Sequence, residues 1–549
     1  MTPRRVVLRT AELMPERSFH GRPAAPGLSA GSVFVLEAST GQRESSGDPT
    51  LEAGALQNAV AAALAELAAL SDEISGDGAD MLAFQIAMLE DDELMTRARV
   101  AIAGGASAQD AWRAVLDAEI AGYAEAEEEY FRARASDLRD IRDRVLASLM
   151  GESGLKPIPP GAVLIAEDLT PSRFLATDWS RGGAIALTHG SSSSHVAMLA
   201  RARGVPMVVG LPADLVGANG QETALVDGAA GTVLIEPGAG ALRAFAERVT
   251  AHEAESAAAA VYLTKPAQTS DGTPISILAN IADLAELDSL DWSTCDGIGL
   301  VRTEFLFYGA PSLPDEETQY SAYRRIAEWG RGKPVTIRTL DAGGDKPIPG
   351  LTVEGETNPF LGLRGIRLSL SRPEVFRIQL RALARAATHG AIEAMLPMIT
   401  VPDELARARS LLDEEIMRLS AAGVPCRRPA LGIMVEVPSA AIAITDFDAD
   451  FFSIGSNDLT QYVTAAARDT GTVADLNDPT NPAVLYLIKH VVAHGRRANK
   501  KVSLCGDAGG EPDLIPAFLE TGLRVLSVAP ASLARTKAAI AAVALVEGQ

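Results

Sequence analysis

The sequence predicts a multidomain α/β protein in which an α/β domain with an inserted all-helical unit is followed by a parallel (β/α)8 barrel. Three observations support this prediction. The chain has 549 residues, of which 47% are apolar, so it is too long for one hydrophobic core. Residues 51–150 show helical periodicity between two stretches of strand-like runs. Eight further strand-like runs alternate with segments mostly long enough for a helix between residues 275 and 528.

The α/β domain is predicted to consist of residues 1–45 and 151–240. The segment from Gly21 to Gly31 is rich in turn-forming residues and is expected to lead into a strand at 32–36. The two stretches share this texture, and the residues between them lack it, so we expect one domain built from both. Further strands are expected at 162–166, 183–187, 207–209 and 232–235.

The inserted unit is predicted at residues 46–150. Glycine and proline become rare there, and apolar residues such as Leu64, Leu67 and Leu70 recur at helical spacing. Acidic runs at 90–93 and 125–129 have two interpretations. They are solvated helix faces, or they form a docking surface for a basic partner.

A polar turn with four consecutive serines, Ser191 to Ser194, follows the expected strand at 183–187. Ser194 or a neighbour is expected to cap a helix that ends at Gly204 and Pro206. His195 would then lie in the first turn, where free N–H groups and the helix dipole favour an anion and keep an imidazole neutral. A neutral histidine beside a phosphate site is a nucleophile for phosphoryl groups. A polar residue over a solvated serine loop is the alternative.

A helical linker is predicted at 241–265, and the barrel at 266–549. An alanine-rich helix from Gly238 to about Leu263 would connect the two parts. The barrel strands are expected at 275–281, 297–301, 335–338, 394–399, 431–437, 451–454, 502–504 and 525–528.

Polar residues stand at the ends of these barrel runs. The carboxyl ends of the strands in a (β/α)8 barrel converge on the active site, so the sequence predicts one charged mouth. The residues in question are Asn280, Arg302, Arg338, Glu436, Asn457, Asp458 and Cys505.

The side chains of this mouth indicate phosphate and metal chemistry. Glu436 and Asp458 offer two carboxylates to a hard cation such as Mg²⁺, which keeps water and substrate oxygens as its other ligands. Arg302, Arg338 and Arg468 can hold a phosphate with planar forks of N–H donors. The expected ligand is a small anion with both a phosphate and a carboxylate.

Two alternatives stay open at this point. Cys505 can transfer a proton to or from a carbon centre, or it is a small buried apolar residue. The arginines can bind a phosphate, or they form structural ion pairs with Glu304 or Asp341.

Composition excludes several classes of function. With 71 acidic and 49 basic residues the formal net charge is −22, which argues against nucleic acid and anionic membranes as partners. The three cysteines are scattered and suggest neither a disulfide framework nor a zinc site. No apolar run approaches membrane-spanning length, so we expect a cytoplasmic protein without membrane insertion.

Several motifs along nearly the whole chain resemble those of one family. The chain is similar to enzyme I of the bacterial phosphoenolpyruvate-dependent sugar phosphotransferase system. The matching segments are 25–27, 89–94, 194–195 with 198–201, 297–307, 343–347, 358–362, 457–462 and 505–506. The chain departs from the family pattern where serines replace the usual Gly-Arg-Thr before Ser194 and His195, at Leu363, and at Asp469 and Thr470.

The resemblance implies residue roles. His195 would be phosphorylated by phosphoenolpyruvate, and Cys505 would protonate the enolate as pyruvate leaves. Glu436 and Asp458 would bind Mg²⁺. The resemblance places the substrate near Arg302, Arg338, Asn457, Asp458, Arg468, Arg364 and Lys346.

The resemblance also implies partners. Residues 46–150 would dock the histidine-containing phosphocarrier protein HPr, and the barrel would form a homodimer. The domain of His195 would swivel between the barrel and the carrier, in the first step of sugar phosphotransfer.

Two other functions compete with this one. A dikinase relative would need a nucleotide-binding domain, for which residues 1–274 contain no glycine-rich phosphate motif. A catalytically silent phosphoenolpyruvate sensor would have no need to retain His195, Glu436, Asp458 and Cys505.

Overall fold

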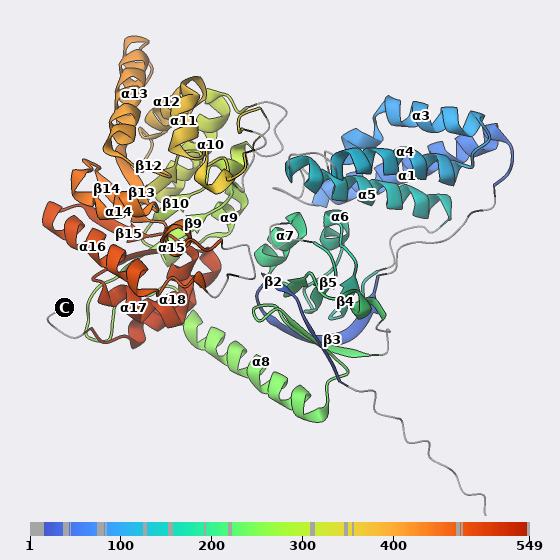
Figure 1. Ribbon diagram of the computed structural model, residues 1–549, viewed down its shortest axis with the longest axis horizontal. Helices are drawn as coiled ribbons and strands as arrows, with labels where there is room; N and C mark the ends of the chain where they lie inside the picture. Colours follow the sequence, from blue (N-terminus) through green and yellow to red (C-terminus); the bar gives the residue numbers. More distant parts are fainter. Residues whose placement is uncertain are drawn as a thin grey trace, which may run out of the picture. The chain divides into compact units, whose positions relative to one another are not determined.

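The computed structural model divides into two compact units, Met1–His252 and Glu253–Gln549 (Figure 1). A mixed parallel and antiparallel β-sheet with its helices, together with a helical bundle, forms the first unit. A β/α barrel forms the second. The structure describes residues 16–36, 43, 45–73, 82, 85–124, 129–151, 157–190, 194–217, 222–307, 313–344, 348, 350–353, 356–467, 473 and 476–545.

The described residues of the first unit include an eight-stranded sheet in the order β1-β8-β7-β3-β4-β5-β6-β2. Its centre is parallel, because β3, β4, β5 and β6 pair side by side in one direction. The outer strands pair antiparallel. The strands are β1 Arg17–His20, β2 Arg22–Ala25, β3 Leu28–Val35, β4 Val163–Ala166, β5 Ala184–Leu187, β6 Met207–Val209, β7 Thr223–Asp227 and β8 Thr232–Ile235.

The turn-rich lead expected from Gly21 to Gly31 is wrong in part, because β2 and the start of β3 lie there. Strand β2 is at the edge of the sheet, where Pro23 removes no hydrogen bond from the interior of the ladder. Strands β1 and β7 were also not expected. Both pair antiparallel with β8, and that pairing rather than local propensity forms them.

The inserted unit is helical, as expected. It contains α1 Pro49–Glu73, α3 Asp92–Ala103, α4 Ala108–Ala124 and α5 Glu129–Leu149. Trp112 and Leu116 are fully buried in its core. Residues Pro49–Leu70 of α1 are long and apolar enough to cross a membrane, but Leu56 and Leu67 on this helix pack into the same core. One face of the helix therefore packs into the bundle.

Short helices and the first part of one long helix complete the first unit. The short ones are α6 Pro171–Leu175, α7 His195–Arg203 and the 3-10 turn η1 Ala213–Gly217. The long helix α8 Ala239–Ala260 follows β8. Phe245 on α8 is buried, and Arg248 forms an ion pair with Asp227 of β7, so the first half of α8 is attached to the sheet.

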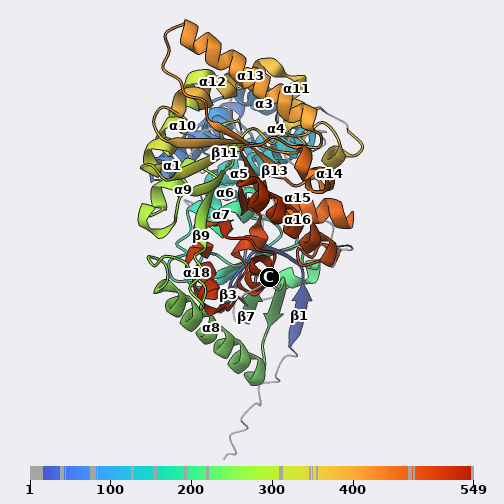
Figure 2. The same ribbon diagram turned by 90° about the vertical axis from the view of Figure 1, so that its left-hand side faces the viewer.

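In the described part of the second unit, eight parallel strands close into a barrel in the order β10-β11-β12-β13-β14-β15-β16-β9 (Figures 1 and 2). Each overlaps one of the runs expected from the sequence, although β12 begins three residues earlier than expected, and the closed sheet confirms the barrel. The strands are β9 Ser276–Ile281, β10 Ile298–Val301, β11 Pro334–Arg338, β12 Ala391–Leu396, β13 Ala430–Val435, β14 Phe451–Ile454, β15 Lys501–Leu504 and β16 Val525–Val528.

Helices surround this barrel and bury its outer face. They are α9 Leu284–Ser289, α10 Glu316–Gly330, α11 Ile366–Ser371, α12 Pro373–Ala386, α13 Pro402–Ala421, α14 Pro438–Ile442, α15 Ser456–Thr464, α16 Pro482–Ala498, α17 Ile515–Glu520 and α18 Leu533–Ala542. Inside the barrel Leu300, Met395, Met434, Phe451 and Cys505 pack together. The interior is filled, so polar side chains collect at the carboxyl ends of the strands.

Candidate active site

Helix α7 begins at His195, and its two ends are formed as expected. The hydroxyl of the N-cap residue Ser194 accepts a hydrogen bond from the N–H of Ala197 at 3.2 Å. Gly204 ends the helix in the left-handed conformation, with φ of 65°. The backbone therefore places His195 at the positive end of the helix dipole. Ser191, Ser192 and Ser193 lie outside the described residues.

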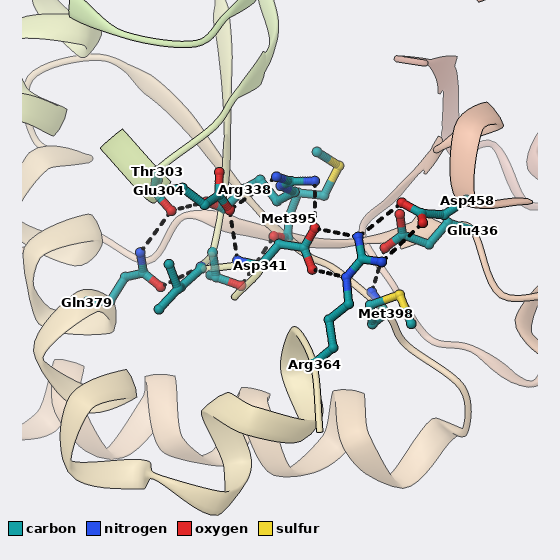
Figure 3. A network of polar contacts seen from close by, with 12 residues as sticks. Thr303, Glu304, Arg338, Asp341, Arg364, Gln379, Met395, Met398, Glu436 and Asp458 are labelled. Atoms are coloured by element: carbon teal, nitrogen blue, oxygen red, sulfur yellow. Dashed lines mark hydrogen bonds and ion pairs between the residues drawn. The ribbon is translucent and has the colours of Figure 1, made fainter. Parts of the chain in front are cut away.

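A network of buried charges lies at the carboxyl ends of the barrel strands (Figure 3). Arg338 is the last residue of β11, and Glu436 follows β13 directly. Asp458 lies in the first turn of α15, just after β14. Arg364 and Asp341 join Arg338 to Asp458. Glu436 is close enough to interact electrostatically with Asp458 and Asp341.

Arg364 is the centre of the network and is fully buried. Its Nε and Nη2 atoms donate to the two carboxylate oxygens of Asp341, each at 3.0 Å. Its Nη1 and Nη2 atoms donate to the two oxygens of Asp458, each at 3.1 Å. Gly343 makes room for this arrangement, since its φ is 102° and a Cβ there would lie 2.7 Å from the carbonyl oxygen of Leu363.

Arg338 forms the ion pairs that the sequence left open as an alternative. Its Nη2 donates to Glu304 Oε1 at 3.1 Å, and its Nη1 lies 3.2 Å from Asp341 Oδ2. Arg338 Nε and Glu304 Oε2 are buried and have no hydrogen-bond partner among the residues that the structure describes. Unpaired buried polar atoms are costly. Arg338 therefore keeps one buried donor that the described residues do not satisfy.

Residues behind the network hold its backbone in place. Thr303 Oγ1 donates to the carbonyl oxygen of Arg338 at 3.0 Å. Gln379 of α12 accepts from the N–H of Leu340 at 3.0 Å and donates to the hydroxyl of Tyr323 at 2.9 Å. Sequence reasoning missed Gln379, which is an interior residue of an amphipathic helix and carries no strand-end signal.

Glu436 is buried at the other side of the network. Its Oε1 accepts the backbone N–H of Met398 at 2.6 Å. Burial, together with the nearby carboxylates of Asp458 and Asp341, raises the pKa of Glu436 to about 8. The positive charges of Arg364 and Arg338 act in the opposite direction and do not outweigh this.

The charges of the network do not balance. Two guanidinium groups, of Arg338 and Arg364, face four carboxyl groups, so two negative charges remain when all are ionised. Within the described ranges no group of three or more His, Cys, Asp or Glu residues is arranged to hold a metal ion. A divalent cation that takes two protein carboxylates, as Mg²⁺ does, fits this excess charge. The four carboxyl groups belong to Glu304, Asp341, Glu436 and Asp458.

A second polar cluster joins α15 to the loop after β15. Asn457 Nδ2 donates to Asp507 Oδ2 at 2.8 Å, and the N–H of Asp507 donates to Asn457 Oδ1 at 3.1 Å. Arg302, with 44% of its side chain exposed, has its Nη2 4.0 Å from Asp507 Oδ1. Asp507 was not expected. Its signal in the sequence is its place three residues after the end of β15, beside Cys505.

Cys505 is buried at the end of β15, among the apolar residues of the barrel interior. Its Sγ lies 3.5 Å from the carbonyl oxygen of Ile454. Burial raises the pKa of the thiol to about 11. Asn280 fixes the backbone there, because its Nδ2 donates to the carbonyl oxygens of Cys505 and Ser527, each at 3.1 Å.

The remaining expected residues, Arg468 and Lys346, lie outside the described residues. One further residue completes the network and was not expected as a site residue. The hydroxyl of Tyr462 on α15 donates to the carbonyl oxygen of Phe360 at 2.6 Å and lies 3.5 Å from Arg364 Nη1. Burial raises the pKa of Tyr462 to about 12, so it stays a neutral donor.

Comparison with known families places this geometry in context. Residues 256–545 match the model described as PEP-utilising enzyme, PEP-binding domain, where PEP is phosphoenolpyruvate. Residues 20–134 match the N-terminal domain, and residues 158–231 the mobile domain, of PEP-utilising enzymes. The chain is 36% identical to the phosphoenolpyruvate-protein phosphotransferase of Geobacillus stearothermophilus over 535 residues, which are 95% of this chain and 93% of that protein. The chain belongs to the phosphoenolpyruvate-protein phosphotransferase family.

Two other relatives with this name agree. The protein of Bacillus subtilis is 35% identical over 94% of this chain and 93% of its own length. That of Haloferax volcanii is 41% identical over 74% of this chain and 72% of its own length. Like other phosphoenolpyruvate-protein phosphotransferases, the chain is a transferase, and its barrel is the part that matches the PEP-binding domain.

Proposed function

We propose that the chain transfers the phosphoryl group of phosphoenolpyruvate to its own His195 and then to a histidine of the phosphocarrier protein HPr, with release of pyruvate. This would be the first step of a sugar phosphotransferase system. The observation that carries the proposal is the buried network of Arg338, Arg364 and their carboxylates at the barrel mouth, within the segment that matches the PEP-binding domain.

Phosphoenolpyruvate is assigned to the barrel mouth. Its phosphate would bind Arg302, which is half-exposed there, and the unpaired Nε of Arg338. Arg364 positions Asp458 by two hydrogen bonds. Mg²⁺, when bound by Glu436 and Asp458, would neutralise oxygens of the substrate. The remaining substrate-binding residues of the proposal are Asn457, Arg468 and Lys346.

His195 would attack the phosphorus atom. A new bond forms between an imidazole nitrogen and phosphorus while the bond from phosphorus to the enol oxygen breaks. The helix N-terminus favours the negative phosphoryl group that results. The enolate left behind takes a proton at carbon from the thiol of Cys505, whose pKa of about 11 keeps it protonated at neutral pH.

One histidine has to serve two sites, so the domain that carries it would move between them. In this proposal residues 1–45 and 151–240 carry His195, and residues 46–150 dock HPr. Residues 241–265 link this part to the barrel at 266–549, which binds the substrate and forms the homodimer. The protein would act in the cytoplasm.

Phosphoryl transfer from labelled phosphoenolpyruvate tests the proposal. With Mg²⁺ present, the chain should take up acid-labile label at His195 and pass it to HPr, and His195→Ala should take up none. Binding of phosphoenolpyruvate without any label would instead indicate a sensor. Formation of phosphoenolpyruvate from ATP and pyruvate would indicate a dikinase.

A further inference from the structure

Helix α16 of the barrel and the short turn after it carry a group of basic side chains without acidic neighbours in the sequence. No Asp or Glu occurs between residues 479 and 506, in a chain whose formal net charge is −22. Most of these side chains repeat at helical spacing and therefore share one face of α16. We call this group the basic stripe. It consists of Lys489, His490, His494, Arg497 and Lys500.

The charges of the basic stripe are not paired. Within the described part of the chain, Lys489, Arg497 and Lys500 form no ion pair, and Lys489 and Arg497 are exposed. Their neighbours differ, because Lys501 forms an ion pair with Glu393 and Arg496 donates to the carbonyl oxygen of Gly522. The stripe thus contains the positive charges of this segment that have no counterion among the described residues.

The stripe residues also repel one another. Burial and the positive charges of Arg497, His490 and Lys500 together lower the pKa of His494. The turn η5 Ile444–Asp446 packs on α16, but the contact of the Asp446 carboxylate is with the hydroxyl of Thr445, at 3.2 Å. No counterion within the barrel therefore relieves the repulsion in the described residues.

An exposed aromatic residue extends the stripe toward the start of α16. Tyr486 is 70% exposed, and its ring stacks on that of His490 with centroids 6.5 Å apart. Tyrosine beside unpaired cations is typical of protein interfaces, where its ring supplies apolar contact area. Figures 1 and 2 both show α16 on the outside of the barrel.

The layout of the charges selects the class of ligand. From Lys489 to Arg497 the stripe extends about 12 Å at the rise of a helix, and Lys500 follows two residues after α16 ends. Charges spread along a line do not converge on one phosphate. A long polyanion such as nucleic acid would extend beyond the stripe onto the acidic remainder of the chain, whose net charge of −22 would repel it, whereas a short acidic segment contacts the stripe alone. Carboxylates spaced along a short polypeptide match both the length and the sign of the stripe.

We propose that the basic stripe of α16 binds an acidic, Asp- and Glu-rich segment of another protein. Most of the stripe lies on the second half of α16, which leads into the amino end of β15. The site at the carboxyl ends of the strands stays accessible while the partner is bound. Binding of this partner would therefore attach the enzyme to another protein, or regulate it, without competing with the substrate.

Binding of a defined acidic peptide tests the proposal. The probe is a fluorescent peptide of about 14 residues with glutamates three and four positions apart. It should bind the intact chain at low salt and dissociate at high salt. K489E/R497E/K500E should weaken binding by roughly tenfold or more. The matched control R99E/R243E/R407E changes the net charge equally at exposed sites and should bind as the wild type does.

Four further measurements distinguish this interpretation from others. Replacing the same three stripe residues with alanine should also weaken binding, which guards against misfolding of the charge-reversed chain. Labelling of His195 should be unchanged in all variants. The proposal is overturned if the peptide fails to bind, if the control loses binding equally, if a single-stranded oligonucleotide of equal charge binds the stripe more tightly, or if the stripe variants change the oligomeric state, which would make a second copy the occupant.

Discussion

One residue at the barrel mouth, Arg364, holds two buried carboxylates together. Arg364 makes four hydrogen bonds to two buried carboxylates, from Asp341 and Asp458. Removing one partner of a buried ion pair is far more harmful than the net contribution of the pair, because a desolvated charge is left behind. The arrangement of the whole mouth therefore depends on this one guanidinium group.

Replacement of Arg364 should expose this dependence. Arg364→Met should lower the free energy of unfolding by about 3–5 kcal/mol, because Asp341 and Asp458 lose their shared partner. Arg364→Lys keeps the positive charge but not the planar fork. Its free energy of unfolding should therefore lie between those of the wild type and Arg364→Met. Chemical denaturation measures both, with the exposed Arg407→Met as control. A loss below about 1 kcal/mol would show that the network reorganises around the gap.

Cys505 should react as a protonated, buried thiol. An unfolded cysteine has a pKa of about 8.5, and burial in the folded chain raises the pKa of Cys505 to about 11. The folded state therefore keeps the thiol proton up to a higher pH than the unfolded state does. The stability that this proton contributes is complete below pH 8.5 and is lost as the pH rises toward 11.

Alkylation kinetics check whether the thiol of Cys505 stays protonated in the folded protein. In a chain with Cys295→Ala and Cys426→Ser, iodoacetamide should react slowly with the folded protein throughout pH 7 to 9. The denatured protein should react with the pH dependence of a free thiol. Fast alkylation of the folded protein near pH 7 would contradict the proposed role as proton donor.

At the scale of elements, strands differ in how clearly the sequence marks them. The barrel strands are parallel and covered on both faces, so each is a continuous apolar run, and all overlap expected runs. Strand β2 contains Pro23 at an edge, and β7 is stabilised by its antiparallel neighbours. Such strands depend on partners distant in the chain, which no local pattern shows.

Helix α7 illustrates an element whose ends were predictable. Its N-cap Ser194 and its C-terminal Gly204 follow local rules that do not need tertiary contacts. Ser194→Ala should destabilise the first turn by about 1 kcal/mol, because the N–H of Ala197 loses its acceptor.

Hydrogen exchange at the amide of Ala197 is the measurement for this change. Exchange should become roughly fivefold faster in Ser194→Ala, whereas Ser194→Thr should preserve most of the protection. Unchanged exchange in the alanine variant would mean that another group caps the helix. Slower labelling of His195 in the same variant would connect the cap to the chemistry.

At the scale of the whole molecule, the net charge of −22 should speed the encounter with a carrier whose docking surface is basic, which is the condition for steering of the proposed partner HPr. Raising the salt from about 20 to 200 mM should lower kcat/KM for HPr several-fold, because exposed charges are screened beyond about 8–10 Å. Labelling of His195 at saturating phosphoenolpyruvate serves as the control and should change little. A kcat/KM for HPr that is independent of salt would argue against steering by the acidic chain.

The sequence by itself determined where most helices and strands lie and which side chains stand at the candidate site. Periodicity located the helical bundle and the barrel strands, and strand-end positions singled out Arg338, Glu436 and Asp458. These features were readable because they are local. The family resemblance identified the phosphotransferase class, which the comparisons confirm.

Only the tertiary structure decided which charges meet. Arg364 lies 94 residues from Asp458 in the chain, yet the two share a pair of hydrogen bonds. The pairing of Arg338 with Glu304 and Asp341 is likewise invisible in the sequence, as is the lack of counterions for α16 among the described residues. The physical reason is that ion pairing and burial depend on distances through space, which are set by the packing of strands and helices remote in the chain.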